Sequence, residues 1–433
     1  MRSKADIKEL LDTLLTEASG YEARATYKFQ SEIATRFAEN AITQNMGGQQ
    51  EKVTLTLARD KHCGTAVTNR LNDESLKELV KRAADVCANS PVDPEYMPPL
   101  GPQTYPATHQ THFNNVAKIT PIDLATEIKK AVQIAAAAKY QASGLMKAQD
   151  NSEVKANSAG LFAESQWTNL SFSTTMHGPA GSGHGGITGE SAEQVDVAAA
   201  AQRALDNAIA AQNPVDIEPG DYTVVFEPEA VWDLLMFLNF NLDARNAEEG
   251  VTPLAGCVGK KIFADSVNLS YLIDDPDLPT IPFGDEGMAN RRIDWVREGV
   301  LEHLYHDRYW AAEKGIEPDP GFFPLYMTGE NRSIDDLIAG CKNGLLVKRL
   351  WYVRYVDLRE LLLTGMTRDG LFKIIDGQVT GPVKNLRFNE SPITFLNNIE
   401  ALSQAKRISS WIDGKVPGVR SREFTFSSKT ESV

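Results

Sequence analysis

Histidine and cysteine, the side chains that most often bind transition metals, are scarce in this sequence. The 433 residues include seven histidines and four cysteines. The cysteines are Cys63, Cys87, Cys257 and Cys341, and no two of them form a CxxC pair. This spacing fits neither a disulfide framework nor a zinc knuckle. We therefore interpret the cysteines as small buried side chains in a reducing compartment.

Excess positive charge and long apolar runs are also missing. The formal net charge of −14 repels a phosphate backbone, which argues against nucleic acid as the main ligand. No segment approaches the roughly eighteen uninterrupted apolar residues that a membrane-spanning helix needs. The N-terminus runs into an amphipathic pattern and does not look like a secretory signal. We predict a cytoplasmic protein that contacts neither membrane nor nucleic acid.

The sequence does contain enough apolar residues for large cores, with 42% hydrophobic and 24% charged residues. Its length favours more than one domain. The clearest boundary is the polar segment between Pro214 and Gly220, which is bracketed by Asn-Pro and Pro-Gly dipeptides. We predict an N-terminal α+β domain over 1–215, with sub-regions of about 1–97 and 116–213, and a β-rich C-terminal domain over 216–433.

Periodicity predicts the elements of the first half. Apolar residues at helical spacing predict helices near 7–15, 76–86, 122–140 and 192–211. Alternation of apolar and polar residues predicts strands at 22–29, 33–37, 53–58, 64–68, 154–163 and 167–176. We expect Met46-Gly47-Gly48 to form a turn of an antiparallel meander.

The second half is dominated by strand-like segments and has two good helical segments, 231–242 and 393–402. The strand-like segments are 222–226, 258–263, 291–298, 344–355, 371–375, 378–383 and 386–388. We therefore predict an α+β protein. Its N-terminal half is an antiparallel sheet with flanking helices, and its C-terminal half is a curved antiparallel sheet, barrel-like, with few helices.

Five segments, in order along the chain, resemble motifs of the TldD/PmbA family, whose members are also called modulators of DNA gyrase. They are 35–40 (TRFAEN), 157–160 (NSAG), 282–287 (PFGDEG, followed by Arg291-Arg292), 299–315, and 376–385 (DGQ followed by GPVKN). Each motif is weak by itself. Because the five keep their order over nearly the whole chain, the sequence is identified as a member of this family.

Catalytic members of the family carry an HExxxH motif on the helix after the strand that opens the last domain. Its histidines bind zinc and its glutamate activates water. The resemblance places these positions at Met236, Phe237 and Asn241. A thioether is a poor zinc ligand, a phenyl ring has no proton to exchange, and an amide is rarely a zinc ligand. Residues 408–433 also lack the further cysteine ligand of catalytic members.

The resemblance therefore implies a PmbA-like (TldE-like) member without catalytic residues, metal or cofactor. It implies a homodimer, or a heterodimer with a zinc-bearing TldD-like protein, in a system that processes peptides or unfolded proteins. The substrate-binding residues stay undefined, and so does any remaining catalytic activity. Two alternatives stay open: a self-sufficient metallopeptidase or hydrolase with a relocated site, and a non-proteolytic homodimeric scaffold.

Two histidine pairs could supply a relocated metal site. His303 and His306 lie three residues apart beside acidic residues, where a helix would place both on one face. We favour solvated or sheet-contact histidines, because the matching family positions are not histidines. His109 and His112 lie in the proline-rich connection 90–120, where nothing fixes their geometry.

Two other clusters have both a functional and a structural interpretation. The glycine-rich segment 178–186 could cradle a phosphate, but it fails both nucleotide-binding signatures, so we predict a flexible hairpin tip. His184 is the residue in it that we would test. The second cluster is aromatic and basic. It could stack on nucleic acid, but we favour a strand with one buried face. That cluster contains Arg349, Trp351, Tyr352, Arg354 and Tyr355.

Overall fold

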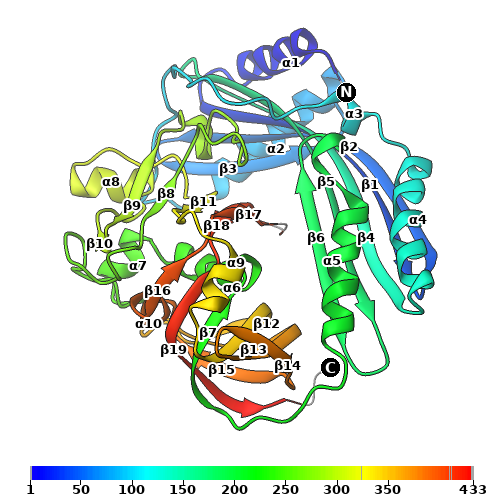
Figure 1. The fold of residues 1–433 in the computed structure, drawn as a ribbon. Helices are drawn as coiled ribbons and strands as arrows, with labels where there is room; N and C mark the ends of the chain where they lie inside the picture. The colour runs from blue at the N-terminus through cyan, green and yellow to red at the C-terminus, as the bar shows by residue number, and fades with distance from the viewer. Residues whose placement is uncertain (1, 323, 409, 411, 431–433) are drawn as a thin grey trace.

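The computed structural model describes residues 2–322, 324–408, 410 and 412–430 (Figure 1). Its first sheet is antiparallel and has six strands in the order β3-β2-β1-β4-β5-β6. These strands are β1 (Glu22–Ala38), β2 (Ala41–Arg59), β3 (His62–Thr68), β4 (Gln141–Asn157), β5 (Phe162–His177) and β6 (Ser182–Gly189). Their length lets the sheet curve around the C-terminal half of the chain (Figure 1).

Helices cover one face of this sheet. Side chains alternate between the faces, so Tyr27 of β1 and Leu55 of β2 point into a core with the first two helices. Capping residues start those helices at Ser3 and Asn72. A second core under the last two helices covers the other end of the same face. The helices of this half are α1 (Lys4–Glu17), α2 (Asp73–Asn89), α3 (Asn114–Ala117), α4 (Pro121–Ala137) and α5 (Val197–Ala210).

The turn of the first hairpin is not where the glycines suggested. Strand β1 continues to Ala38, which pairs with Ala41 of β2, so the two-residue turn is Glu39-Asn40. Both turn residues have positive φ, 50° and 63°, as a type I′ hairpin turn requires. The expected turn at 46–48 is wrong, because these residues lie inside β2.

The next hairpin also differs from the expectation. The predicted strand 154–163 crosses the real turn, which lies between β4 and β5. The Asn157 side chain accepts hydrogen bonds from the backbone N–H groups of Ala159 and Leu161, and Gly160 has a φ of 90°. Residues 141–153 of β4 were missed because their polar side chains hide the alternation.

Only part of the glycine-rich segment 178–186 is the predicted hairpin tip. Residues 178–181 join β5 to β6, with a hydrogen bond from Gly178 N to the Gly181 carbonyl oxygen, whereas the remainder is strand. Residues 182–189 form β6, and its glycines face the alanines of α5. A Cβ at Gly183 would lie 2.3 Å from the carbonyl oxygen of Ala204 and from the nitrogen of Ala208. A Cβ at Gly185 would lie 2.1 Å from the carbonyl oxygen of Ala200. Glycine is needed here because helix and strand backbones are in close contact.

The C-terminal half contains a closed barrel. Its strands pair in the order β12-β7-β19-β15-β13, and β12 also pairs with β13. Strand β14 extends this sheet and β16 pairs with β19. The strands are β7 (Gly220–Phe226), β12 (Asn343–Asp357), β13 (Leu362–Ile375), β14 (Gln378–Pro382), β15 (Leu386–Glu390), β16 (Ile399–Leu402) and β19 (Val419–Lys429).

A smaller sheet of short strands, in the order β10-β9-β8-β11-β18-β17, lies between the barrel and the first sheet (Figure 1). Its strands are β8 (Leu269–Tyr271), β9 (Ile293–Arg297), β10 (Val300–Leu301), β11 (Leu325–Met327), β17 (Lys406–Arg407) and β18 (Gly414–Val416). The helices of this half are α6 (Pro228–Asn239), α7 (Ala244–Glu248), α8 (Arg308–Lys314), α9 (Ile334–Ala339) and α10 (Pro392–Asn397).

The predicted α+β class is confirmed, as is a barrel-like C-terminal half. Two elements of that half were predicted wrongly. Residues 258–263 contain only an isolated bridge at Lys261. The predicted helix 393–402 ends at Asn397, and the chain then enters β16. No helix within the described residues is long and apolar enough to cross a membrane.

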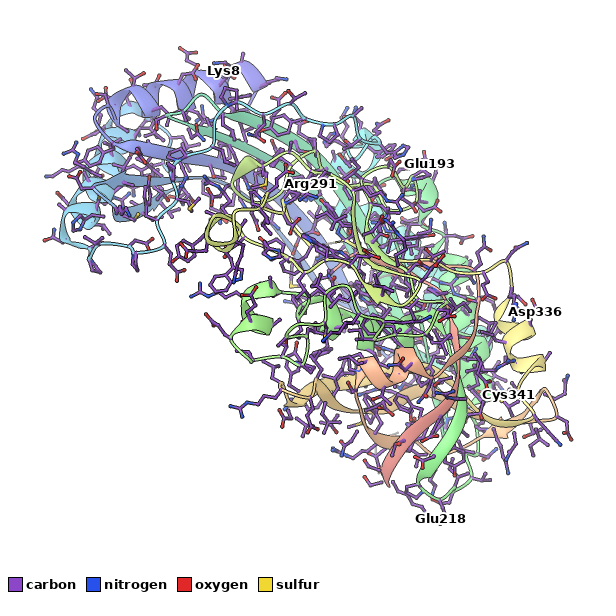
Figure 2. All side chains as sticks on the ribbon, turned by 90° about the vertical axis from the view of Figure 1, so that its left-hand side faces the viewer. Lys8, Glu193, Glu218, Arg291, Asp336 and Cys341 are labelled. Carbon is purple, nitrogen blue, oxygen red and sulfur yellow. The ribbon has the colours of Figure 1, made fainter. Side chains whose placement is uncertain are left out.

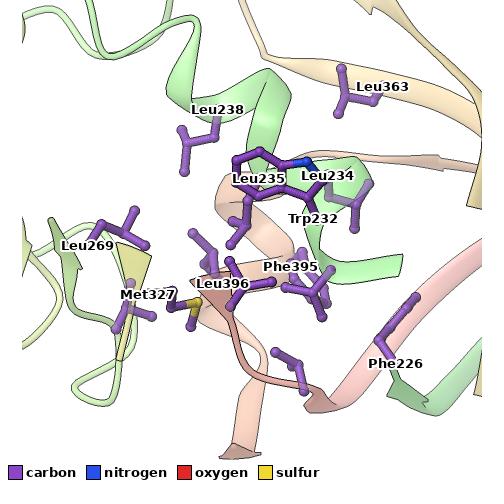
Figure 3. Packing of buried hydrophobic residues seen from close by; sticks show 14 of the residues in the cluster. Phe226, Trp232, Leu234, Leu235, Leu238, Leu269, Met327, Leu363, Phe395 and Leu396 are labelled. Carbon is purple, nitrogen blue, oxygen red and sulfur yellow. The ribbon is translucent and has the colours of Figure 1, made fainter. Parts of the chain in front are cut away.

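Figure 2 shows the molecule turned by 90°, with Lys8 on α1 and Glu218 before β7 at opposite ends. Arg291 lies between them, where the loops of the C-terminal half approach the first sheet. The largest core belongs to the C-terminal half and is centred on α6 (Figure 3).

Candidate functional site

Helix α6 is the element on which the zinc motif of catalytic relatives is expected. Strand β7 leads directly into it, and Pro228 occupies its first turn, where the missing N–H would be unpaired in any case. Trp232, Leu234, Leu235 and Leu238 are fully buried (Figure 3). This packing fixes the helix, so the positions of its remaining side chains are well defined.

The three positions matched to the zinc motif lie at the C-terminal end of α6. Met236 and Phe237 are half-buried, and Asn241 is buried just beyond the helix. The Asn241 Nδ2 group donates to the Phe237 carbonyl oxygen and to the Tyr355 Oη, each at 2.7 Å. The Phe237 and Tyr355 rings meet edge to face, with centroids 5.0 Å apart.

The chemistry of this group is that of an uncharged packing cluster. Burial raises the pKa of the Tyr355 phenol above its ordinary value, although its hydrogen bond with Asn241 opposes the shift. The phenol therefore stays neutral at physiological pH. A thioether, a phenyl ring, an amide and a neutral phenol offer no anionic or imidazole ligand for zinc and no base to activate water.

A large polar cavity lies between the first sheet and the loops of the C-terminal half. Its volume is about 680 Å³, within the range of ligand-binding sites. The sheet contributes Lys28, Lys155 and Glu153, where Glu153 forms ion pairs of 3.1 Å and 3.7 Å with the two lysines. Strand β8 contributes Tyr271, and a loop of the C-terminal half contributes Phe283. The cavity can therefore contact both polar and apolar parts of an extended ligand.

The pair His303 and His306 is brought together by the fold, but not on a helix. Residues 302–307 are an extended connection, so the predicted helix is wrong here, and α8 begins only at Arg308. His303 Nε2 lies 2.7 Å from an oxygen of the fully buried Asp319 side chain, and His306 Nδ1 lies 3.9 Å from the same oxygen. These three side chains could hold a metal ion.

Both carboxylate oxygens of Asp319 already accept hydrogen bonds. Its Oδ1 accepts from Arg291 Nη2 at 2.7 Å, and its Oδ2 accepts from the backbone N–H of His306 at 2.9 Å. The His306 Nδ1 atom lies 2.7 Å from the Leu304 carbonyl oxygen, which requires the proton to be on that nitrogen. A cation at this position would have to displace that proton and lie near the Arg291 guanidinium. We therefore interpret the cluster as a structural hydrogen-bond network.

His184 lines a second polar cavity of about 540 Å³ between β6 and the barrel. Burial lowers its pKa to about 4, and the neighbouring Arg349 lowers it further, while Asp369 opposes the shift. Arg349 Nη1 donates to Asp369 at 3.1 Å, and Ser182 Oγ donates to the other Asp369 oxygen at 2.7 Å. His184 is therefore a neutral imidazole at pH 7.

Asp233 of α6 is another buried ionisable group in this region. Burial raises its pKa to about 7, while Arg349 and the Leu350 N–H group oppose the shift. Its Oδ2 accepts the Leu350 N–H at 3.2 Å, which ties α6 to β12. Burial also raises the pKa of Glu229, one turn earlier on α6, with a smaller contribution from Glu227. Glu229 lines the same cavity as His184.

The other predicted candidates remain apart from these sites. His109 and His112 have separate partners, the Asp274 carbonyl oxygen at 2.9 Å and Asp150 at 3.0 Å. All four cysteines are free. The aromatic segment is part of strand β12, as expected, but Trp351 and Tyr352 are 39% and 58% exposed. The expected buried face of that segment is therefore wrong.

Sequence reasoning missed Tyr355 as a partner of Asn241, and it missed Asp319 and Asp369. Each of these residues reaches its partner across a long stretch of chain, and no motif spacing connects them. The one weak sequence signal at Asp369 is its Asp-Gly dipeptide. In the structure the φ of Asp369 is 56°, and strained backbone of this kind clusters at functional sites.

The barrel and α6, which follows strand β7, together form the centre of the C-terminal domain. Residues 219–428 match the PmbA/TldA metallopeptidase C-terminal domain. This match places the C-terminal half of the chain in the TldD/PmbA family. The protein is thus related to TldD/TldE-type metalloproteases.

Curated relatives match part of the chain. A zinc metalloprotease TldD homolog from Saccharolobus solfataricus is 24% identical over 48% of this chain and 49% of its own length. A metalloprotease from Methanothermobacter thermautotrophicus is 24% identical over 54% of this chain and 53% of its own length. The chain thus matches about half the length of these relatives.

Solved structures share the fold over nearly the whole chain. TldE from Thermococcus kodakarensis superposes with a TM-score of 0.87, at 19% identity, over 97% of this chain and 100% of its own. A protein from Thermotoga maritima that is named as a candidate modulator of a DNA gyrase has the same TM-score, identity and coverage.

Proposed function

We propose that this protein is a non-catalytic subunit of a TldD/TldE-type protease system that processes peptides or unfolded proteins. The observation that carries the proposal is the side-chain set at the end of α6. Met236, Phe237 and Asn241 are the residues that the resemblance matches to the zinc motif, and Tyr355 contacts Phe237 and Asn241. This set supplies no zinc ligand and no general base.

The partner that fits this proposal is a zinc-bearing TldD-like chain. The relatives that match in sequence are named as metalloproteases, and one neighbour in structure is named TldE. The cavity of about 680 Å³ between the two halves would contribute part of a chamber for an extended peptide. In this arrangement the partner supplies the metal and the nucleophile, and this chain supplies binding surface. Pairing with a second copy of itself remains the alternative assembly.

Co-expression with an HExxxH homologue tests the proposal. We expect the two chains to co-elute, and we expect the pair to cleave denatured β-casein in a chelator-sensitive reaction. A partner with the motif glutamate replaced by glutamine is the control, and it should bind but not cleave. This chain alone should be inert and contain no stoichiometric metal by elemental analysis. If the chains do not associate, the subunit role is contradicted.

The second candidate function is a self-sufficient hydrolase with a relocated metal. The cluster of His303, His306 and Asp319 is the observation that favours it. Under this alternative the purified chain binds about one metal ion and cleaves β-casein alone, and Asp319→Asn abolishes both metal binding and cleavage. The hydrogen bonds that both Asp319 oxygens already accept favour the subunit role instead.

A further inference from the structure

One segment of the first sheet has a free edge. Strand β2 pairs with β1 along its whole length, but β3 covers only 53–59 on its other side. Among the described residues, no strand or loop forms backbone hydrogen bonds with the outer edge of 41–52. Ten of these residues, 41–50, are exposed and span roughly 33 Å of extended backbone.

This edge lacks the features that normally prevent strands from associating. Residues 41–50 (AITQNMGGQQ) contain no charged residue and no proline, and one bulge lies near their start. Proteins usually protect a free edge with lysine, proline, repeated bulges or a covering segment. The protein as a whole has a net charge of −14, but this edge has no charged residue to protect it. We therefore expect a partner strand to cover it.

The other sheet ends are protected. Segment 90–93 covers β3, through a bridge between His62 and Val92 and a hydrogen bond from Asp93 N to the Lys61 carbonyl oxygen. Strand β6 lies against β13 of the barrel, where Ser182 Oγ donates to Asp369 at 2.7 Å. The half of β12 that β7 does not cover is interrupted by register shifts and carries Arg349 and Arg354. Among these strands, β2 has the longest free edge without charged residues.

Gly48 on this edge gives a second, independent observation. Gly48 packs against nothing, because a Cβ built on it would meet no atom within 4 Å. No turn requires it either, because it lies inside a regular strand opposite Glu32. A strand glycine without a local packing role marks a place where a ligand or another backbone approaches closely.

The face that carries Gly48 leads into the large cavity. Gly48 pairs with Glu32, Glu32 with Gln149, and Gln149 with Asn169, which forms one row of side chains across four strands. Gln149 Nε2 donates to Glu32 at 2.7 Å, and both Gln149 and Asn169 line the cavity of about 680 Å³. A strand added beside β2 would extend this row, so alternate side chains of the added strand would lie on the cavity side.

We propose that the β2 edge, residues 41–50, binds an extended segment of unfolded polypeptide by strand addition and presents it to the cavity between the two halves. Main-chain hydrogen bonds would provide the affinity. The absence of charge at the edge avoids like-charge repulsion with any sequence, so binding would be sequence-tolerant. This inference rests on the proposed role in peptide processing, and it names the site of capture.

Binding of a fluorescein-labelled dodecapeptide of zero net charge tests the inference by fluorescence anisotropy. The blocking variant is M46K/G48K, which places two lysines on the edge at positions where side chains have room. The matched control is M46L/G48A, which changes the same positions without adding charge. We expect at least tenfold weaker binding for M46K/G48K and a change of less than twofold for M46L/G48A. Circular dichroism checks that both variants fold.

A second probe separates strand addition from side-chain recognition. The same peptide, methylated on alternate backbone nitrogens, keeps its side chains but loses the donors that a ladder needs. We expect its binding to be at least tenfold weaker than that of the parent peptide. Equal binding of the two peptides, or equal binding by M46K/G48K and wild type, overturns the inference.

Two further outcomes also decide the question. If wild-type protein binds no peptide but still co-elutes with the zinc-bearing partner, the capture site is wrong and the subunit role stands. Light scattering could instead show that the wild type is a dimer and M46K/G48K a monomer. If this monomer binds the peptide no better than the wild type does, the edge joins two copies of this chain. In that case the β2 edge binds a second copy of this chain and not a peptide.

Discussion

At the scale of single residues, the end of α6 depends on a contact that only the fold creates. The three positions that the resemblance names, Met236, Phe237 and Asn241, lie together at the C-terminal end of α6 and just beyond it. The resemblance gave no indication of Tyr355, which is 114 residues from Asn241 in the chain. The partner is defined by the closure of β12 into the barrel, and closure leaves no local pattern. No local sequence pattern indicates the contact between Asp319 and His303 either, because 16 residues separate them in the chain.

We predict that Tyr355→Phe lowers the free energy of unfolding by about 1 kcal/mol. The substitution keeps the edge-to-face ring contact but removes the hydroxyl, so Asn241 Nδ2 keeps only the Phe237 carbonyl oxygen as acceptor. Urea unfolding measures the change. Tyr352→Phe is the control, because that side chain is 58% exposed, and it should have no measurable effect. Equal effects of the two variants would contradict the role of the hydrogen bond.

Also at this scale, Asp233 should make stability depend on pH. Its pKa is about 7 in the folded protein and roughly 3.9 in an unfolded chain. Between these values the folded state holds a proton that the unfolded state has released. Stability therefore falls as pH rises from about 4 to 7, and the loss then stays constant.

Asp233→Asn removes this dependence. The variant should be more stable than wild type at pH 8, by on the order of 2 kcal/mol, with little difference at pH 4.5. Thermal melts at the two pH values measure the difference. The exposed Asp335→Asn is the control and should show the same difference at both pH values. A variant that gains nothing at pH 8 would show that Asp233 is not held in a raised-pKa environment.

At the scale of elements, the sequence predicted helices well and glycine-containing strands badly. Capping residues and apolar periodicity located α1, α2 and α4, because those signals are local. Glycine is depleted in strands, so both β6 and the middle of β2 read as turns. In β6 the glycines are explained by the close approach of α5, which is a tertiary contact. In β2, Gly48 has no packing role within the chain, whereas a Cβ at Gly47 would lie 3.3 Å from the Ile33 side chain.

This difference gives a prediction. Gly183→Ala should destabilise the protein by about 3 kcal/mol, because the added Cβ would lie 2.3 Å from backbone atoms of α5 and the helix must move. Gly48→Ala should be neutral or slightly stabilising, because its Cβ meets no atom within 4 Å and alanine restricts the unfolded chain. Chemical denaturation of the two variants compares them. Similar losses would mean that α5 does not lie directly on β6.

At the scale of the whole molecule, the two halves are joined by a buried ion pair. Arg407 of β17 meets Glu190, which follows β6, through both of its terminal nitrogens at 2.7 Å and 2.8 Å. The side chains are only 12% and 7% exposed. The sequence could not predict this pair, since its members are 217 residues apart in the chain. Its position holds the small sheet, and with it one wall of the large cavity, against the first sheet.

Glu190→Ala should lower stability by about 3 kcal/mol, because it leaves the Arg407 guanidinium buried with Asp413 as its nearest remaining carboxylate, at 3.4 Å. Arg407→Ala should cost a similar amount. The double variant should lose less than the sum of the single variants, because the charge that each substitution leaves unpaired is then absent. Thermal unfolding of the four proteins measures the coupling. Glu127→Ala, which breaks the exposed pair with Lys130, is the control and should cost less than about 0.5 kcal/mol. If Glu190→Ala costs no more than this control, the ion pair does not hold the halves together, and the cavity between them must depend on other contacts.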